Sequence, residues 1–102
     1  MDRNDAIKKI RTALKRRSGK PWSVTGGRGT AWGWIKITAP PKRRTGGGLT
    51  PTEQKELAAL LGFDKPVHFQ GVHIPASHNH WQEYIDRAEG RTPSVVGQRY
   101  WD

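Results

Sequence analysis

Apolar positions recur at helical spacing in three segments of the chain. The first predicted helix covers residues 4–17, with Asn4 as its N-cap and with Gly19 and Pro21 as its stop. Its apolar positions lie three and four residues apart: Ala6, Ile7, Ile10, Ala13 and Leu14. Because these positions share one face, we expect that face to be buried and the charged face to lie in water.

Two later segments carry clear helix start signals. Thr50, Pro51 and Glu53 form a capping-box pattern with proline at the first helical position, which predicts a helix over residues 50–61. Ser77 is the predicted N-cap of another helix, which ends at Gly90. The expected buried positions of these helices are Leu57, Leu60 and Leu61 in the first, and Trp81, Ile85 and Ala88 in the second.

Alternating positions between the first two helices predict a β-hairpin. The stretches "PWSV" and "TAWGWIKIT" flank the turn "TGGRG", and "PVHFQGVHI" is a candidate third strand. Side chains alternate along a strand, so Ala31, Gly33, Ile35 and Ile37 share one face, and Trp32, Trp34 and Lys36 share the other. The aliphatic face is expected to pack on the first helix. The tryptophan face has two readings: it is exposed and stacks bases, or it is covered by helix 50–61 or 78–89 and belongs to the core.

These elements predict a single α+β domain over residues 1–102, in the order α-β-β-α-β-α. It has a roughly three-stranded antiparallel sheet, with the helices mainly on one face. The chain of 102 residues is long enough for one small core, and its five tryptophans concentrate the apolar area in a few large side chains. "APPKRRTGGG" predicts a flexible basic Pro/Gly loop at residues 39–49.

Positive charge is concentrated in the first half of the chain. Residues 1–48 contain thirteen Lys/Arg against two Asp, or +11, and residues 49–102 contain five against seven Asp/Glu, or −2, which gives the net +9. Such a balance predicts a polyanionic partner, most commonly nucleic acid. The expected binding surface combines the cations of the first helix with those of the turn and loop, and with the tryptophan face. The candidate nucleic-acid-binding residues are Lys8, Lys9, Arg11, Lys15, Arg16, Arg17, Lys20, Arg28, Trp32, Trp34, Lys36, Lys42, Arg43 and Arg44.

Other chemistry is weakly represented. The chain contains no cysteine, which excludes disulfides and thiolate ligands and is compatible with a cytoplasmic protein. The histidines cluster at His68, His73, His78 and His80, but His78 and His80 diverge on a helix, so we expect exposed or capping histidines and no metal. We expect no catalytic residue and no cofactor, because no paired carboxylates or nucleophile–histidine arrangement stands out. No stretch has the length or pattern of a signal peptide or membrane span.

The order of motifs resembles a family of small domains. "AIKKIRTALKRRSGKPWSV", a strand ending in "WIKIT", then "LTPTEQKELAALLGF" and "FQGVHI" are similar to the domains attached to large polyvalent proteins of phages and bacterial mobile elements. The resemblance covers roughly residues 6–75, and the insertion "PPKRRTGGG" departs from it. It implies a cytoplasmic protein of phage or mobile-element origin, and it carries over no activity to particular residues.

The leading hypothesis is a non-enzymatic nucleic-acid-binding accessory protein. The alternative is a protein-binding inhibitor or adaptor, for example an anti-defence protein, that occupies a nucleic-acid site on its partner. A nucleic-acid hydrolase that acts through the histidines is the third hypothesis. The charge distribution favours the first, because it needs only a basic surface.

Overall fold

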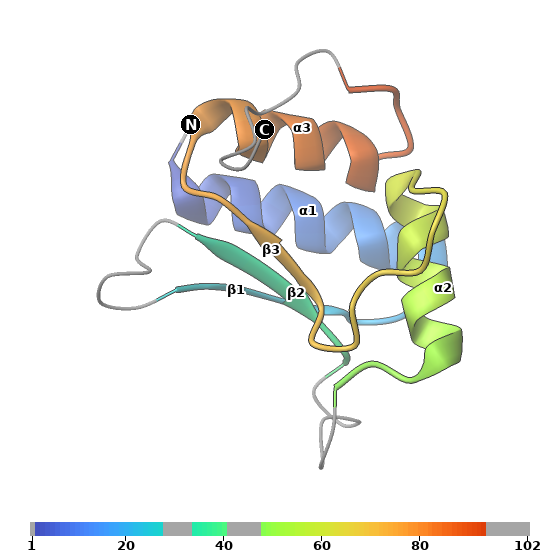
Figure 1. Cartoon of the computed structure of the whole chain (residues 1–102). Helices are drawn as coiled ribbons and strands as arrows, with labels where there is room; N and C mark the ends of the chain where they lie inside the picture. Colours follow the sequence, from blue (N-terminus) through green and yellow to red (C-terminus); the bar gives the residue numbers. More distant parts are fainter. Residues whose placement is uncertain (1, 28–33, 41–47, 94–102) are drawn as a thin grey trace.

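The computed structural model describes residues 2–27, 34–40 and 48–93. The elements are α1 (Arg3–Ser18), β1 (Ser23–Gly26), β2 (Ile35–Thr38), α2 (Pro51–Leu61), β3 (Val72–Ile74) and α3 (His78–Ala88) (Figure 1). Their order is the predicted α-β-β-α-β-α. The α+β fold with three helices and a three-stranded antiparallel sheet is confirmed.

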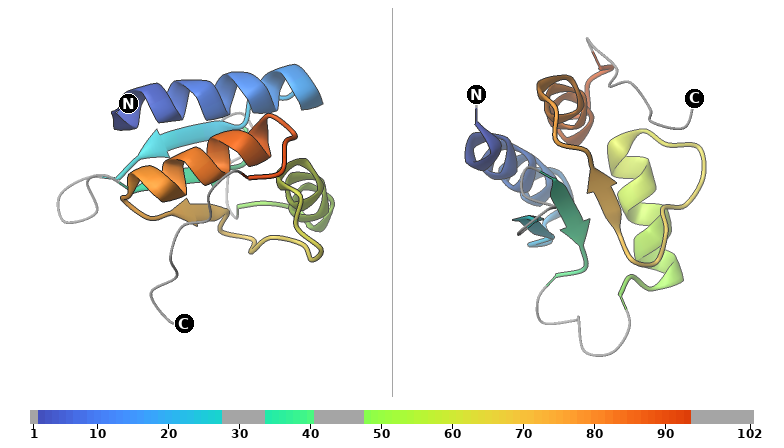
Figure 2. Two further views of the ribbon diagram at one scale, coloured as in Figure 1. Left: turned by 90° about the horizontal axis from the view of Figure 1, so that it is seen from above. Right: turned by 60° about the vertical axis from the view of Figure 1, so that its left-hand side comes forward.

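The strands pair antiparallel in the order β1-β2-β3. α1 and α3 lie side by side over one face of the sheet, and α2 lies at one end of these helices and contacts both (Figures 1 and 2). The other face of the sheet has none of the three helices over it (Figure 2). The predicted placement of helices mainly on one face is therefore correct.

The core lies between α1, α3 and the sheet. Ile10 and Leu14 of α1 and Ile35, Ile37 and Ile74 of the sheet are fully buried. The predicted apolar stripe of α1 is buried along its whole length, as is the aliphatic face of β2. The covering of the sheet by α1 follows from matching these two apolar faces.

The caps of α2 and α3 agree with the prediction, and the cap of α1 does not. Thr50 and Glu53 form the complete capping box of α2, and the Ser77 hydroxyl accepts a hydrogen bond from the backbone N–H of His80. The N-cap of α1 is Asp2, whose carboxylate accepts from the N–H of Asp5 at 2.8 Å. Predicting Asn4 as the cap was wrong, because the helix starts earlier at a residue that caps equally well.

The third strand is shorter than predicted. Of residues 66–74 only Val72–Ile74 form a strand, and a turn precedes them. Gly71 has φ +100°, and a Cβ there would lie 2.1 Å from the carbonyl oxygen of Ile37. The turn is therefore pressed against β2 at a position that only glycine can occupy.

The predicted loop at 39–49 lies largely outside the described residues. Its two ends, Ala39 and Leu49, are buried in the core, so the chain is anchored on both sides of residues 41–47. No described helix is long and apolar enough to cross a membrane.

Candidate nucleic-acid interface

The cations of α1 fall into two groups according to helical spacing. Arg3 and Arg17 continue the buried stripe of Ile7, Ile10 and Leu14 at three- and four-residue steps, one at each end of the helix. The other cations of α1 lie away from this stripe and are exposed: Lys8, Lys9, Arg11, Lys15 and Arg16. The two groups have different surroundings.

Arg17 joins the C-terminal ends of two other helices. Its Nη1 donates to the carbonyl oxygens of Leu60 at 2.8 Å, Ala88 at 2.8 Å and Arg87 at 3.3 Å. Carbonyls at a helix C-terminus lack partners within the helix and carry the negative end of the dipole, so a guanidinium is well suited to them. Arg17 is therefore part of the packing of α2 and α3 against α1.

Two further arginines of α1 also bind protein oxygens. The Arg3 Nη1 donates to the Gly27 carbonyl at 3.0 Å, and the Arg11 Nη2 donates to the Val24 carbonyl at 2.7 Å. Arg11 thus covers part of the outer edge of β1, where an unpaired strand would otherwise invite a partner, and Arg3 holds the chain just after β1.

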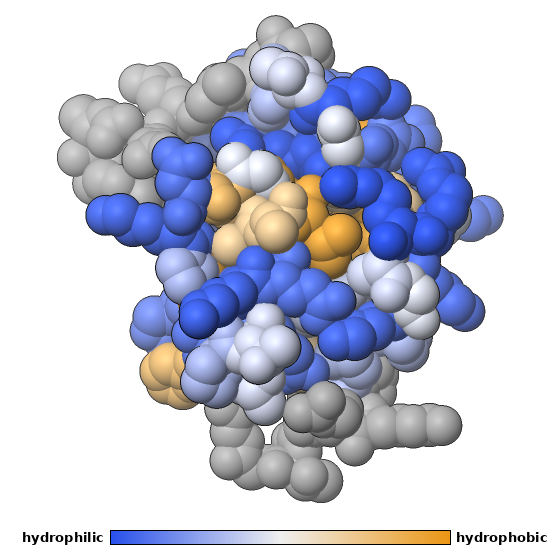
Figure 3. All heavy atoms as spheres, turned by 90° about the vertical axis from the view of Figure 1, so that its right-hand side faces the viewer, coloured by the Kyte–Doolittle hydropathy of each residue, from blue (hydrophilic) through white to orange (hydrophobic). Residues whose placement is uncertain are grey.

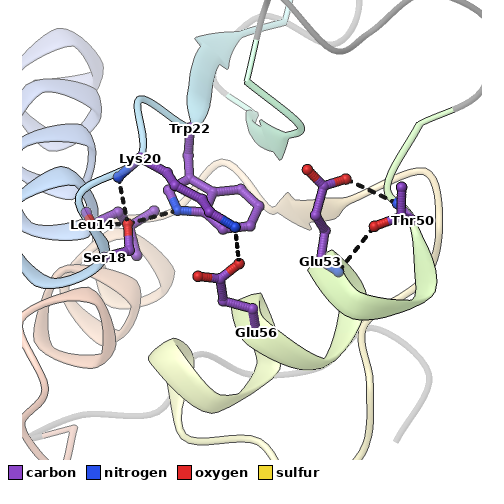
Figure 4. Close-up of polar contacts among 7 residues, drawn as sticks. All are labelled: Leu14, Ser18, Lys20, Trp22, Thr50, Glu53 and Glu56. Atoms are coloured by element: carbon purple, nitrogen blue, oxygen red, sulfur yellow. Dashed lines mark hydrogen bonds and ion pairs between the residues drawn. The ribbon is translucent and has the colours of Figure 1, made fainter.

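Lys20, in the segment between α1 and β1, forms an ion pair with Glu56 of α2. Its Nζ lies 2.6 Å from the Glu56 Oε1, as Figure 4 shows. The same view shows the Ser18 hydroxyl, which donates to the Leu14 carbonyl and accepts from the Trp22 indole N–H and the Lys20 backbone N–H. Lys20 is thus positioned by a hydrogen-bonded turn and is half-buried.

The exposed cations of α1 line a groove against α3. Within the described part of the chain, the side chains of Lys8, Lys9, Lys15 and Arg16 form no ion pair or hydrogen bond. The groove has a volume of about 370 Å³. We call it the α1 groove, and it is lined by three cations, Lys8, Lys9 and Arg16, by two carboxylates, Asp5 and Glu89, and by Thr12 and Ala13. Lys15 lies outside it but is also exposed.

The predicted sheet residues lie on the opposite side of the domain. Lys36 is exposed on the face of β2 that points away from α1, and strand alternation puts the half-buried Trp34 on the same face. The alternative that helix 50–61 or 78–89 covers this face is wrong, since α3 lies over the other face and α2 at the end of the helices. The structure therefore separates two surfaces that the sequence prediction combined. Arg28, Trp32, Lys42, Arg43 and Arg44 lie outside the described residues.

A second hollow, of about 400 Å³, lies near the C-terminal ends of α2 and α3. The side of the molecule that carries α2 shows apolar surface surrounded by hydrophilic residues (Figure 3). The hollow's three arginines all bind oxygen atoms of the protein. Besides Arg17, these are Arg87, which pairs with Glu83 and the Leu61 carbonyl, and Arg91, which pairs with Asp86 and Glu89. This hollow is a weaker candidate for an anion than the α1 groove.

The histidines are dispersed. His80 is buried with its Nδ1 2.7 Å from the Ser77 hydroxyl, whereas His78 is exposed with its ring 5.1 Å from that of Trp81. The predicted divergence of these two residues is confirmed. Among the described residues, no group of three or more histidines, aspartates and glutamates is placed to hold a metal ion.

Comparison of the chain with protein-family models, curated proteins and solved structures finds no match. The resemblance to phage and mobile-element domains therefore stays a prediction.

Proposed function

We propose that this protein is a non-enzymatic nucleic-acid-binding accessory protein that contacts the phosphate backbone through the α1 groove. The observation that carries the proposal is the division of the cations on α1. Arg3, Arg11 and Arg17 are bound to backbone carbonyls, whereas the groove cations Lys8, Lys9 and Arg16 have no partner within the described residues.

The groove has the dimensions and charge of a backbone contact. Lys8 and Arg16 are eight residues apart on one helix, which corresponds to roughly 12 Å along its axis. Each strand of a duplex carries one phosphate per 3.4 Å or so of the duplex axis, so roughly three of them lie over this distance when α1 runs parallel to that axis. Of the two carboxylates that line the groove, Glu89 already pairs with Arg91 at 2.6 Å, so Asp5 alone stands against Lys8, Lys9 and Arg16 and the groove is net positive.

The test is the salt dependence of duplex DNA and RNA binding, measured by fluorescence anisotropy. The variant carries Lys8→Glu and Arg16→Glu, and Arg17 is left unchanged because it holds the fold. The matched control carries Lys55→Glu and Lys65→Glu, two exposed lysines outside the groove, and has the same net charge.

We expect the affinity of the natural protein to fall steeply with salt, since each neutralised phosphate releases counterions. The groove variant should lose about two units of the slope of log affinity against log salt, and the control should keep it. Equal losses in the two variants would show that total charge alone drives binding. A salt-independent response would favour the protein-binding inhibitor instead.

A further inference from the structure

The face of the sheet opposite the helices carries a row of exposed polar side chains. Thr25, Lys36 and His73 are cross-strand partners in register, and all three are exposed. The flanking rows point the other way: Val24, Ile37 and Val72 on one side, and Ile35 and Ile74 on the other, are all buried aliphatic residues, with Gly26 at the edge of the second row. The row is therefore a surface of the native sheet and does not belong to the core.

Lys36 and His73 are held close together by the strand pairing. The Gly27 N–H donates to the Trp34 carbonyl at 2.8 Å, so alternate residues of β2, including Lys36, direct their backbone groups to β1. Lys36 and His73 are then a non-hydrogen-bonded pair, the kind in which facing side chains are closest. Lys36 therefore disfavours the protonated form of His73 directly opposite it, and neither side chain has an ion-pair partner among the described residues.

A turn adds a second imidazole and an exposed ring. His68 and Phe69 precede β3, and their ring centroids are 4.6 Å apart. Phe69 is 47% exposed, and among the described residues no other large hydrophobic side chain is classed as exposed. The Gly71 N–H donates to the His68 carbonyl at 2.9 Å, and Gly71 itself is pressed against β2, so the turn is fixed relative to the sheet.

The charged groups around His73 would favour a bound anion. Burial lowers the pKa of His73, and the positive charges of Lys36 and His68 lower it further. The charged groups acting on His73 from β2 and from the turn are thus both cationic, with no carboxylate among them. A bound anion would oppose the two charge effects and raise the pKa.

We propose that Lys36, His68, Phe69 and His73, which we call the sheet site, bind an unpaired stretch of nucleic acid. A phosphate lies between Lys36 and His73, and a neighbouring base stacks on Phe69. This proposal rests on the proposed function and adds a second surface to it. An unpaired strand fits because it offers both a phosphate and a free base face, whereas bases in a duplex are already stacked.

The probe is a short labelled oligothymidylate, whose binding is measured by anisotropy between about pH 8 and pH 5. Affinity should increase as the pH falls, by about tenfold for each unit by which the phosphate raises the pKa of His73. His73→Gln should reduce this increase, since it leaves His68 as the one imidazole of the sheet site. His78→Gln is the matched control, because His78 is exposed on α3, away from the sheet site, and its removal should leave the pH dependence intact.

Phe69→Ala tests the stacking contact and should weaken oligothymidylate binding by roughly 5- to 150-fold. Duplex binding through the α1 groove should be unchanged in both sheet variants, and a thermal melt confirms that each variant is folded. Losses confined to the single-stranded probe would support the sheet site.

Three results would overturn it. One is an identical pH dependence in His73→Gln and His78→Gln, and another is an unaltered affinity of Phe69→Ala. The third is complete loss of oligothymidylate binding in the α1 groove variant while the sheet variants bind normally, which would leave the proposed function standing. If the natural protein binds neither probe, both proposals are wrong.

Discussion

Arg16 and Arg17 are neighbours in the sequence with different surroundings. Arg16 lines the α1 groove and has no partner among the described residues, while Arg17 bridges carbonyls of α2 and α3. The difference follows from helical spacing, because Arg17 lies three residues after Leu14 and four after Ala13, in line with the buried stripe. A cation at the end of the buried apolar stripe of a helix is thus a candidate for hydrogen bonds that hold other elements of the fold in place.

Replacing these two residues separately should distinguish their roles. Arg17→Ala leaves the C-terminal carbonyls without their charged donor and should lower the free energy of unfolding by about 1–3 kcal/mol. Arg16→Ala should change it by less than about 0.5 kcal/mol, as is usual for an exposed side chain without partners. Urea denaturation of both variants measures the difference. An equal cost would mean that the bridge contributes little to stability.

At the scale of elements, the sheet shows how far local pattern determines structure. The alternation in "WIKIT" was sufficient to predict that Ile35 and Ile37 are buried and Lys36 exposed. Capping residues likewise placed the starts of α2 and α3. The start of α1 and the turn before β3 could not be predicted in this way. Asp2 and Asn4 cap equally well, and the turn depends on the contact of Gly71 with β2, which is remote in sequence.

Adjacent residues of β2 should therefore respond oppositely to truncation. Ile35→Ala empties a site with 0% exposure and should destabilise the protein by about 2–5 kcal/mol. Lys36→Ala removes a side chain that points into water and should cost less than about 0.5 kcal/mol. Both values come from urea or thermal unfolding. A large cost for Lys36→Ala would show that its side chain is needed for folding and would count against the sheet site.

At the scale of the whole molecule, tertiary contacts decide which cations are available. The partners of Arg17 lie 43 to 71 residues away, so no local pattern could show that they would meet. The sequence did place Lys36 on the strand face away from the first helix, but the binding surface predicted from it still combined the two. His73 and Phe69 were missed because their relation to Lys36 depends on the pairing of β2 with β3. What remained visible from the sequence was the excess of positive charge in residues 1–48.

That excess should make the free protein and its complex respond oppositely to salt. The net charge is +9, and residues 1–48 alone carry +11, so the folded state is weakened by self-repulsion that salt screens. The melting temperature without nucleic acid should rise with sodium chloride; relief of about 0.5 kcal/mol corresponds to roughly 2–4 °C for a domain of this size. Chloride is used because sulfate also strengthens apolar burial.

The variant with Lys8→Glu and Arg16→Glu tests the origin of this effect. Each replacement removes one positive charge and adds one negative charge, so the net charge falls from +9 to +5. All of this change lies in residues 1–48. The melting temperature of the variant should therefore rise less with salt than the melting temperature of the natural protein does. Duplex affinity of the natural protein should fall over the same salt range, because counterion release then gains less entropy. A natural protein whose melting temperature is constant or falls with chloride would show that its cations are already balanced within the fold. The groove cations would then have no excess charge to offer a phosphate backbone.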